Sequence, residues 1–290
     1  MRRRMLVVCV CVGVFAATGC ATQAPFVRVG RPADFMTADR TAIPVYTVPN
    51  ISVNVNTVKE NSWVTWLPGG SNMATTAAYL ANNEILQRFL TAGLGEHAQQ
   101  GVARLFSEAL ADINRLRAAS MVVFRGSISE TAFQKSQVDA SREMLSVETF
   151  IGFTAARGGI VPMVDLTVAY LSSGTPRRTI WADKFTCELA PIKPNDNLVA
   201  DQSARAKQLV TQALERLRPF VERELRGEAY DTFPRVQVNY GGSRTEEGWL
   251  IENGEQGMAI RLVGGRTRVI PKSFVQTMTV VKPGAPPRSE

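Results

Sequence analysis

The sequence predicts an α+β fold, in which a mixed sheet with a long antiparallel hairpin packs against amphipathic helices and a small all-β unit follows. Three observations lead to it. Alternating runs on both sides of a Ser-Ser-Gly-Thr-Pro turn fill residues 161–189. A helical apolar stripe runs from Leu209 to Leu225. After Gly227, short alternating runs are separated by Gly-Gly and Asn-Gly pairs, which favour hairpins.

The first twenty residues have the organisation of an export signal. Three arginines at 2–4 precede an apolar run from Met5 to Thr18, which is shorter than the roughly 20 residues of a membrane-spanning helix. The ending, Ala-Thr-Gly-Cys at 17–20, resembles a bacterial lipobox, where cleavage frees a cysteine that carries diacylglycerol. We therefore expect a signal peptide at 1–19 and lipid on Cys20. The alternatives are an ordinary signal peptide with a chance cysteine, or an uncleaved anchor.

Residues 20–42 are expected to form a flexible tether behind the lipid. Polar and small residues predominate there, with prolines at positions 25 and 32. Ala21, rather than an aspartate, follows the cysteine, and this pattern resembles the outer-membrane default of bacterial lipoproteins. The expected location is the outer membrane, lipid-anchored and facing the periplasm.

The composition and the net charge indicate which classes of partner to expect. The 290 residues are 45% hydrophobic and 20% charged, as in an ordinary globular protein. The net charge of +7 includes the three arginines of the signal, so the mature chain carries +4. This mild excess suits anionic head groups or cell-wall polymers and argues against nucleic acid.

An α+β domain is expected over residues 43–227. A period-two run at 51–56, preceded by a proline, predicts an edge strand. Apolar runs at 121–128 and 147–153 predict two further strands. The alternation over 161–189 then predicts the long hairpin.

Two amphipathic helices are predicted between the first strands, over 77–90 and 102–116, with Gly93 and Gly95 expected to break the chain between them. The clearest helix begins near Asp201. Its charged side, which includes Glu224, is predicted to be a solvated face.

A small β-barrel-like domain is expected over 228–282, followed by a disordered tail at 283–290. Its strand lengths and turns resemble SH3-like or Sm-like barrels. Because its core would be its own, we expect residues 43–226 to fold without it.

The α+β segment also resembles a group of bacterial envelope lipoprotein domains. The segment 165–176, Asp-Leu-Thr-Val-Ala-Tyr-Leu-Ser-Ser-Gly-Thr-Pro, is followed at 180–181 by an Ile-Trp pair, and Met-Val-Val-Phe-Arg-Gly-Ser-Ile stands at 121–128. The group includes the curli-secretion lipoprotein, the penicillin-binding-protein activator lipoproteins and the amino-terminal domain of TolB. The resemblance implies a domain that binds other envelope proteins and has no active site. The long alternating strands of a membrane pore are not found.

Catalytic residues are sparse. His97 is the only histidine and no nucleophile stands beside it in the sequence. If Cys20 is lipidated and the signal cysteines are removed, Cys187 is left alone, and its apolar neighbours predict a buried thiol. Asp165 and Asp183 lie on facing strands and could form a carboxylate pair. We rather expect them to be solvent-face residues or partners of Arg177, Arg178 and Lys184. No metal site, cofactor or nucleotide loop is predicted.

Three functions compete at this point. The first is a non-enzymatic lipoprotein that acts as an adaptor or accessory factor for another envelope protein. The second is a binder of peptidoglycan or polysaccharide, with Trp249, Tyr240 and Arg244 as its surface. The third is an unrecognised hydrolase. The sequence does not predict an oligomeric state.

Overall fold

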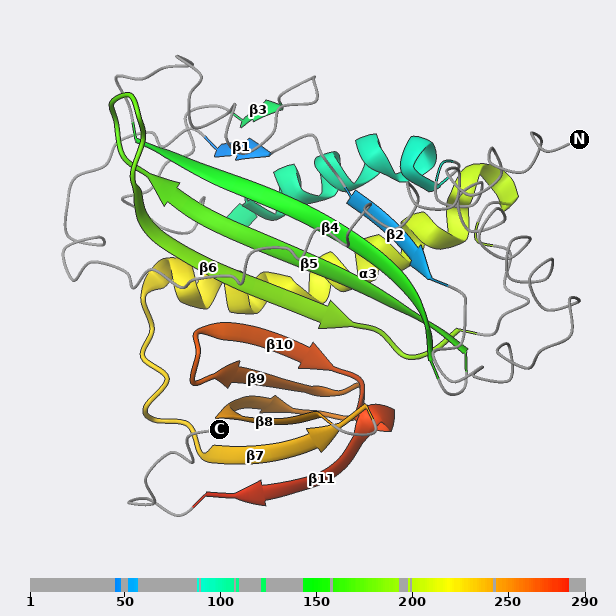
Figure 1. The fold of residues 1–290 in the computed structure, drawn as a ribbon, viewed down its shortest axis with the longest axis vertical. Coiled ribbons are helices and arrows are strands. Elements are labelled where there is room, and N and C mark those ends of the chain that lie inside the picture. The colour runs from blue at the N-terminus through cyan, green and yellow to red at the C-terminus, as the bar shows by residue number, and fades with distance from the viewer. Residues whose placement is uncertain are drawn as a thin grey trace, which may run out of the picture.

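The computed structural model describes residues 45–47, 52–56, 88, 90–106, 108–109, 121–123, 143–156, 159–192, 198, 200–241 and 244–281. They form an α+β structure in which one mixed sheet of 11 strands is covered on one face by helices (Figure 1). The predicted signal peptide, Cys20, the tether and the tail at 283–290 lie outside the described residues.

Three long antiparallel strands make the centre of the sheet. They are β4 (Met144–Ala156), β5 (Gly159–Leu171) and β6 (Thr179–Glu188). The β5–β6 pair confirms the hairpin predicted over 161–189. Alternate side chains of these strands point to the helices and are buried, because successive residues of a strand face opposite sides.

Three short strands join the free side of β4 in parallel. They are β1 (Val45–Thr47), β2 (Ser52–Asn56) and β3 (Met121–Val123). β1 lies between β4 and β3, and β2 pairs with β4 further along. The sheet is therefore mixed, as expected from the sequence.

The long helix α3 (Ala200–Arg226) crosses the helix-covered face of the sheet. All eight apolar residues of its predicted stripe are buried, and the helix continues through Pro219. The buried stripe consists of Leu209, Val210, Ala213, Leu214, Leu217, Phe220, Val221 and Leu225.

A second helix packs beside α3, and it corrects one prediction. Residues 90–106 are continuously helical, so Gly93 and Gly95 do not break the chain. A glycine costs a helix only about 1 kcal/mol relative to alanine, and burying Leu90 and Leu94 in the core offsets this. Gly101 has a packing role instead, because a Cβ there would lie 2.7 Å from Leu214 Cδ1.

Five strands follow α3, joined by short turns and by the 3-10 turn η2 (Lys272–Phe274). Four antiparallel pairings give the order β11-β7-β8-β9-β10. The strands are β7 (Arg235–Tyr240), β8 (Arg244–Asn253), β9 (Met258–Leu262), β10 (Arg266–Ile270) and β11 (Val275–Val280).

These strands continue the main sheet. β10 pairs in parallel with β6, from Arg266 opposite Lys184 to Val269 opposite Cys187. One face of the strands has a small core of its own, with Val236, Val238, Tyr240, Met258, Ile260 and Ile270. The other face adds Ala259 and Val269 to the main core. The C-terminal strands thus share their packing with the α+β part.

Candidate functional site

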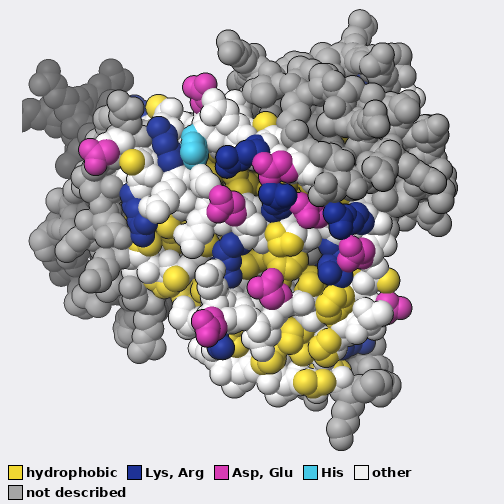
Figure 2. Space-filling view, turned by 180° about the vertical axis from the view of Figure 1, so that it is seen from behind, with side chains coloured by type: hydrophobic (Ala, Val, Ile, Leu, Met, Phe, Trp, Pro, Cys, Tyr) yellow, Lys and Arg dark blue, Asp and Glu magenta, His cyan; other side chains and the backbone are white. Residues whose placement is uncertain are grey.

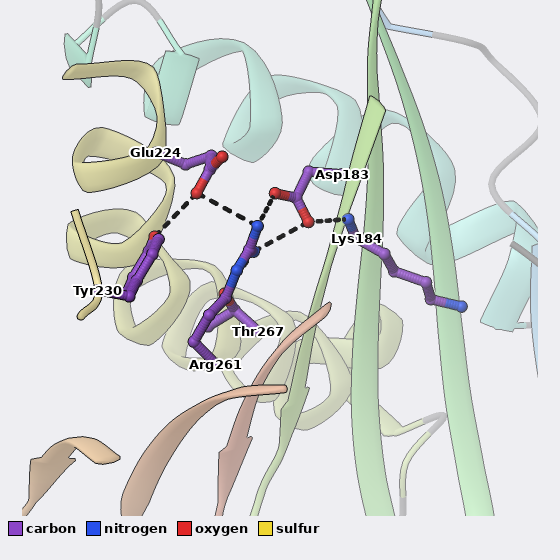
Figure 3. A network of polar contacts seen from close by, with 6 residues as sticks. All are labelled: Asp183, Lys184, Glu224, Tyr230, Arg261 and Thr267. Carbon is purple, nitrogen blue, oxygen red and sulfur yellow. Dashed lines mark hydrogen bonds and ion pairs between the residues drawn. The ribbon is translucent and has the colours of Figure 1, made fainter. Parts of the chain in front are cut away.

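Among the described residues, a group of buried charged side chains lies where the C-terminal strands meet the main sheet. Asp183 comes from β6, Arg261 from β9 and Glu224 from α3, while Thr267 of β10 and Tyr230, just after α3, complete it (Figure 3). We call these five residues the junction network. It connects β6, α3 and the β9–β10 hairpin, which are separate segments of the sequence.

Arg261 is the centre of the junction network. Its Nη1 donates hydrogen bonds to Asp183 Oδ1 and to Thr267 Oγ1, both at 2.9 Å. Its Nη2 contacts Asp183 Oδ2 and lies 3.3 Å from Glu224 Oε2. Glu224 also accepts a hydrogen bond of 2.9 Å from the Tyr230 hydroxyl, and the guanidinium lies over the Tyr230 ring, 5.1 Å from its centre.

The junction network holds one guanidinium against two carboxylates. Burial raises the pKa of Asp183 to about 7, even though its hydrogen bonds with Arg261 lower it, and the Glu224 charge raises it further. Burial lowers the pKa of Arg261, but Asp183 and Glu224 raise it by more. The arginine therefore stays charged, and Asp183 is the group whose protonation the burial favours.

The sequence reasoning missed this network. Arg261 stands in the run Met-Ala-Ile-Arg-Leu, whose neighbours gave no reason to expect a buried cation. Glu224 was assigned to the solvated face of α3, and this is wrong, because it is 5% exposed. The period-two alternation of the strand could have indicated that Arg261 is buried. Arg261 follows Ala259 by two residues, so the two side chains lie on the same buried face.

A second charged group lies on the opposite face of the same strands. Lys184 Nζ is 2.8 Å from Asp165 Oδ2, which confirms one of the partners expected for Asp165. Further along, Arg268 lies 3.4 Å from Glu188 and 3.7 Å from Glu246. Burial raises the pKa of Glu188, while Arg268 and Arg244 lower it.

Asp165 and Asp183 do not form a carboxylate pair. In the register of β5 and β6, Asp165 is opposite Thr186 and Asp183 is opposite Val168. Val168 belongs to the main core, whereas Asp165 is on the other side of β5. The two carboxylates therefore face opposite sides of the sheet, and the arrangement offers no acid–base pair between them.

His97 joins the two helices. Its Nε2 lies 2.9 Å from Thr211 Oγ1 and 3.2 Å from the carbonyl oxygen of Lys207, both in α3. The prediction placed this residue in a break between helices, but it lies within the helix at 90–106. Its contacts are those of a residue that fixes helix packing.

Cys187 is a buried free thiol, as predicted. It points into the main core from β6, and burial raises the pKa of its thiol to about 12. Because the thiolate is the reactive form, the native residue is chemically inert near neutral pH.

The chain was compared with known families and structures. No protein-family model matches the chain, and no curated protein matches it. Among solved structures, a hypothetical protein, CT253 from Chlamydia trachomatis, covers 64% of this chain and 98% of its own, with 10% sequence identity and a TM-score of 0.29.

Trp249, Tyr240 and Arg244 do not form one cleft. Tyr240 is 1% exposed in the small core and pairs with Arg244, whereas Trp249 pairs with Arg235 on the same two strands. Since Tyr240 and Arg235 are five residues apart on one strand, Trp249 and Tyr240 face opposite sides. Of the three, only Arg244 is largely exposed, and its side chain is 62% accessible.

The helix-covered face has a groove of about 210 Å³ between the helix at 90–106 and α3. Arg218 of α3 contacts Glu108 on the other side of the groove at 2.5 Å, and it also contacts Glu222, one turn further along α3, at 2.7 Å. Figure 2 shows acidic and basic side chains interspersed over this face, with hydrophobic side chains gathered nearer the C-terminal strands. Basic and acidic side chains both line the groove, so its charge does not favour an anion over a cation.

The described residues show neither a metal cluster nor a membrane-spanning helix. No three histidine, cysteine, aspartate or glutamate side chains gather there in a way that would hold a metal ion. Among the same residues, no helix is long and apolar enough to cross a membrane.

Proposed function

We propose that this chain is a lipid-anchored lipoprotein of the outer membrane, facing the periplasm, that acts without catalysis as an adaptor or accessory factor for another envelope protein. The observation that carries the proposal is the sequence of residues 1–20, where three arginines, an apolar run and Ala-Thr-Gly-Cys stand in lipobox order. The resemblance of residues 43–226 to envelope lipoprotein domains supports the binding role.

The state of the cysteines is consistent with this proposal. With Cys20 joined to lipid and the signal removed, only the inert thiol of Cys187 remains. An exported protein of this kind must be held together by packing and ion pairs, without an internal disulfide. The junction network provides such a cross-link between distant elements.

A second candidate is a lipoprotein that binds peptidoglycan or polysaccharide through its C-terminal strands. The five C-terminal strands stand in the order β11-β7-β8-β9-β10, with a 3-10 turn before β11. The resemblance of their lengths and turns to SH3-like or Sm-like barrels supports this candidate. The burial of Tyr240 removes one aromatic residue from the proposed sugar surface, so we rank this function second. An envelope hydrolase ranks third, because Asp165 and Asp183 face opposite sides.

The anchor is tested by labelling cells with an alkyne-bearing palmitate analogue and separating membranes from the soluble periplasmic fraction. We expect the wild-type chain to take up label and to sediment with outer membrane. Cys20→Ala should lose the label and become soluble, whereas Cys187→Ala should keep both properties. A Cys20→Ala chain that still fractionates with membrane would refute the anchor.

The binding role needs a separate measurement. Crosslinking in intact cells, followed by mass spectrometry, should join the wild-type chain to an envelope protein, and the crosslink should weaken when Cys20→Ala releases the chain into solution. A confined tether raises the effective concentration of partners on the same membrane, which is the physical reason for this expectation. Crosslinks to peptidoglycan alone would favour the second candidate.

A further inference from the structure

The last strand of the sheet, β11, has a free edge. In the strand order it stands at one end, with β7 as its neighbour, and no other described strand pairs with it (Figure 1). Residues 276–280 are all exposed. Such an edge offers unpaired backbone groups to another strand.

The hydrogen bonds between β11 and β7 show which backbone groups of β11 point to its unpaired edge. Val281 donates its N–H to the carbonyl of Arg235 at 2.8 Å, so residue 281 bonds toward β7. Because residues of an antiparallel strand bond alternately to the two sides, Thr279 and Thr277 also face β7, whereas Val280 and Met278 direct their backbone groups outward. The register shift at Gln276 precedes this regular part.

The edge also exposes apolar side chains. Met278 is opposite Val238 and Val280 is opposite Val236, so both lie on the face that forms the small core. They are nevertheless 37% and 68% exposed. The apolar face of the C-terminal strands therefore continues to its edge, and no described residue covers it there.

The sequence of this strand is nearly palindromic. Residues 275–281 read Val-Gln-Thr-Met-Thr-Val-Val, with Met278 at the centre. An antiparallel pair of two such strands places Met278 opposite the partner's Met278 and Thr277 opposite the partner's Thr279. The apolar side chains then remain on one face and the threonines on the other, where cross-strand threonine pairs are favourable.

We propose that the chain forms a symmetric dimer in which β11 pairs antiparallel with β11 of a second copy, about a two-fold axis at Met278. Three properties support self-pairing: the palindrome, the absence of charged residues and prolines at 275–281, and the outward backbone groups of Met278. The strand lacks the charges that protect sheet edges in monomeric proteins. A two-fold axis through Met278 also gives a hydrogen-bonded pair there, as that geometry requires.

One strand pair buries less than the roughly 800 Å² per partner of a standard stable interface. We therefore expect a dimer that dissociates on dilution. An extended segment of a different protein is the competing occupant of the same edge, and the experiment below separates the two.

The register is tested with two differently tagged full-length chains, one carrying Thr277→Cys and the other Thr279→Cys. In the proposed pair these positions form a non-hydrogen-bonded pair with Cα atoms about 4.5 Å apart, within the range of a disulfide. Mild oxidation of co-expressed chains should give a disulfide-linked heterodimer. Either chain alone should give little, because identical positions are offset by two residues along the strand.

The equilibrium is tested with the purified full-length chain in detergent, by light scattering over a dilution series. Met278→Lys places two like charges opposite each other and should weaken association at least tenfold. Val263→Lys is the matched control, because Val263 is 47% exposed in the turn between β9 and β10, and it should leave the dilution curve unchanged.

Three results would each overturn the proposal. The first is a wild-type chain that is monomeric throughout the dilution series. The second is equal crosslinking in all three samples, the mixed pair and the two single variants. The third is a Thr277→Cys chain that crosslinks only to another protein, which would assign the edge to a different partner.

Discussion

Arg261 and Asp183 join β9 to β6 through two parallel hydrogen bonds between buried side chains. They are 78 residues apart in the chain. Since β9 and β6 do not pair directly, this contact crosses β10 and reinforces its parallel pairing with β6. The junction network is therefore the polar part of the connection between the main sheet and the C-terminal strands.

Arg261→Met should strongly destabilise the protein. It leaves Asp183 and Glu224 buried without their cation, and breaking a buried ion pair costs about 3–5 kcal/mol of unfolding free energy. Urea unfolding followed by tryptophan fluorescence measures this loss. Arg244→Met is the control and should change stability by less than about 1 kcal/mol, since that side chain is largely exposed. Similar losses in both variants would contradict the role assigned to Arg261.

Asp183 should make stability fall as pH rises. Its folded pKa of about 7 is above the unfolded value of about 3.9, so the native state binds the extra proton between these values. Its contribution is fully present below about pH 4 and is lost as pH rises through about 7. Unfolding free energies at pH 5 and 8 should therefore differ more in the wild-type chain than in Asp183→Asn. Equal differences would show that another group is responsible for the pH dependence.

Gly248→Ala should disturb the contact of β8 with β9. A Cβ at this position would lie 2.2 Å from the carbonyl oxygen of Arg261, and a backbone atom cannot move aside cheaply. We expect a loss of at least about 1–3 kcal/mol, measured by thermal and urea unfolding. Gly264→Ala, which meets no atom within 4 Å, should be nearly neutral. A neutral Gly248→Ala would mean that the two strands are further apart than described.

Cys187 should be unreactive in the native protein and reactive after unfolding. In a Cys20→Ala chain without its signal it is the only thiol, so Ellman's reagent reports on it alone. The pKa of about 12 and complete burial predict very slow native labelling at about pH 8, and one equivalent in urea. Rapid stoichiometric labelling of the native chain would contradict this.

A chain that ends at Arg226 should not unfold cooperatively, contrary to the expectation from sequence alone. It lacks β10, so the edge of β6 opens, and it lacks Arg261, so Asp183 and Glu224 lose their partner. Circular dichroism during urea titration should show a broad transition. A sharp transition would restore the 43–227 segment as an independent domain.

The local features of the fold could be predicted from the sequence. The alternation at 161–189 gave the central hairpin, and the stripe of α3 was correct at each of its eight apolar positions. The apolar neighbours of Cys187 correctly indicated its burial. These features depend on short-range periodicity, which a single sequence contains.

The features that depend on distant pairing could not be predicted. Nothing near Lys184 or Arg266 indicates that β6 and β10 are neighbours, so the C-terminal strands looked separate. For the same reason the burial of Glu224 and Arg261 was missed, because each is explained only by the other. At Gly93 and Gly95 the sequence predicted a local break, but the helix continues because core packing outweighs the low helix propensity of glycine.

The parallel pairing of β10 with β6 also sets an order of events in time. The strand that completes β6 is made about 80 residues later, which at synthesis rates of about 5–20 residues per second is roughly 4–16 s. Until then one edge of β6 is open, because its contacts with β10 cannot form. We therefore expect this edge of the main sheet to be the last part to fold. During synthesis, the edge of β6 that β10 later covers therefore stays open until the last strands have been made.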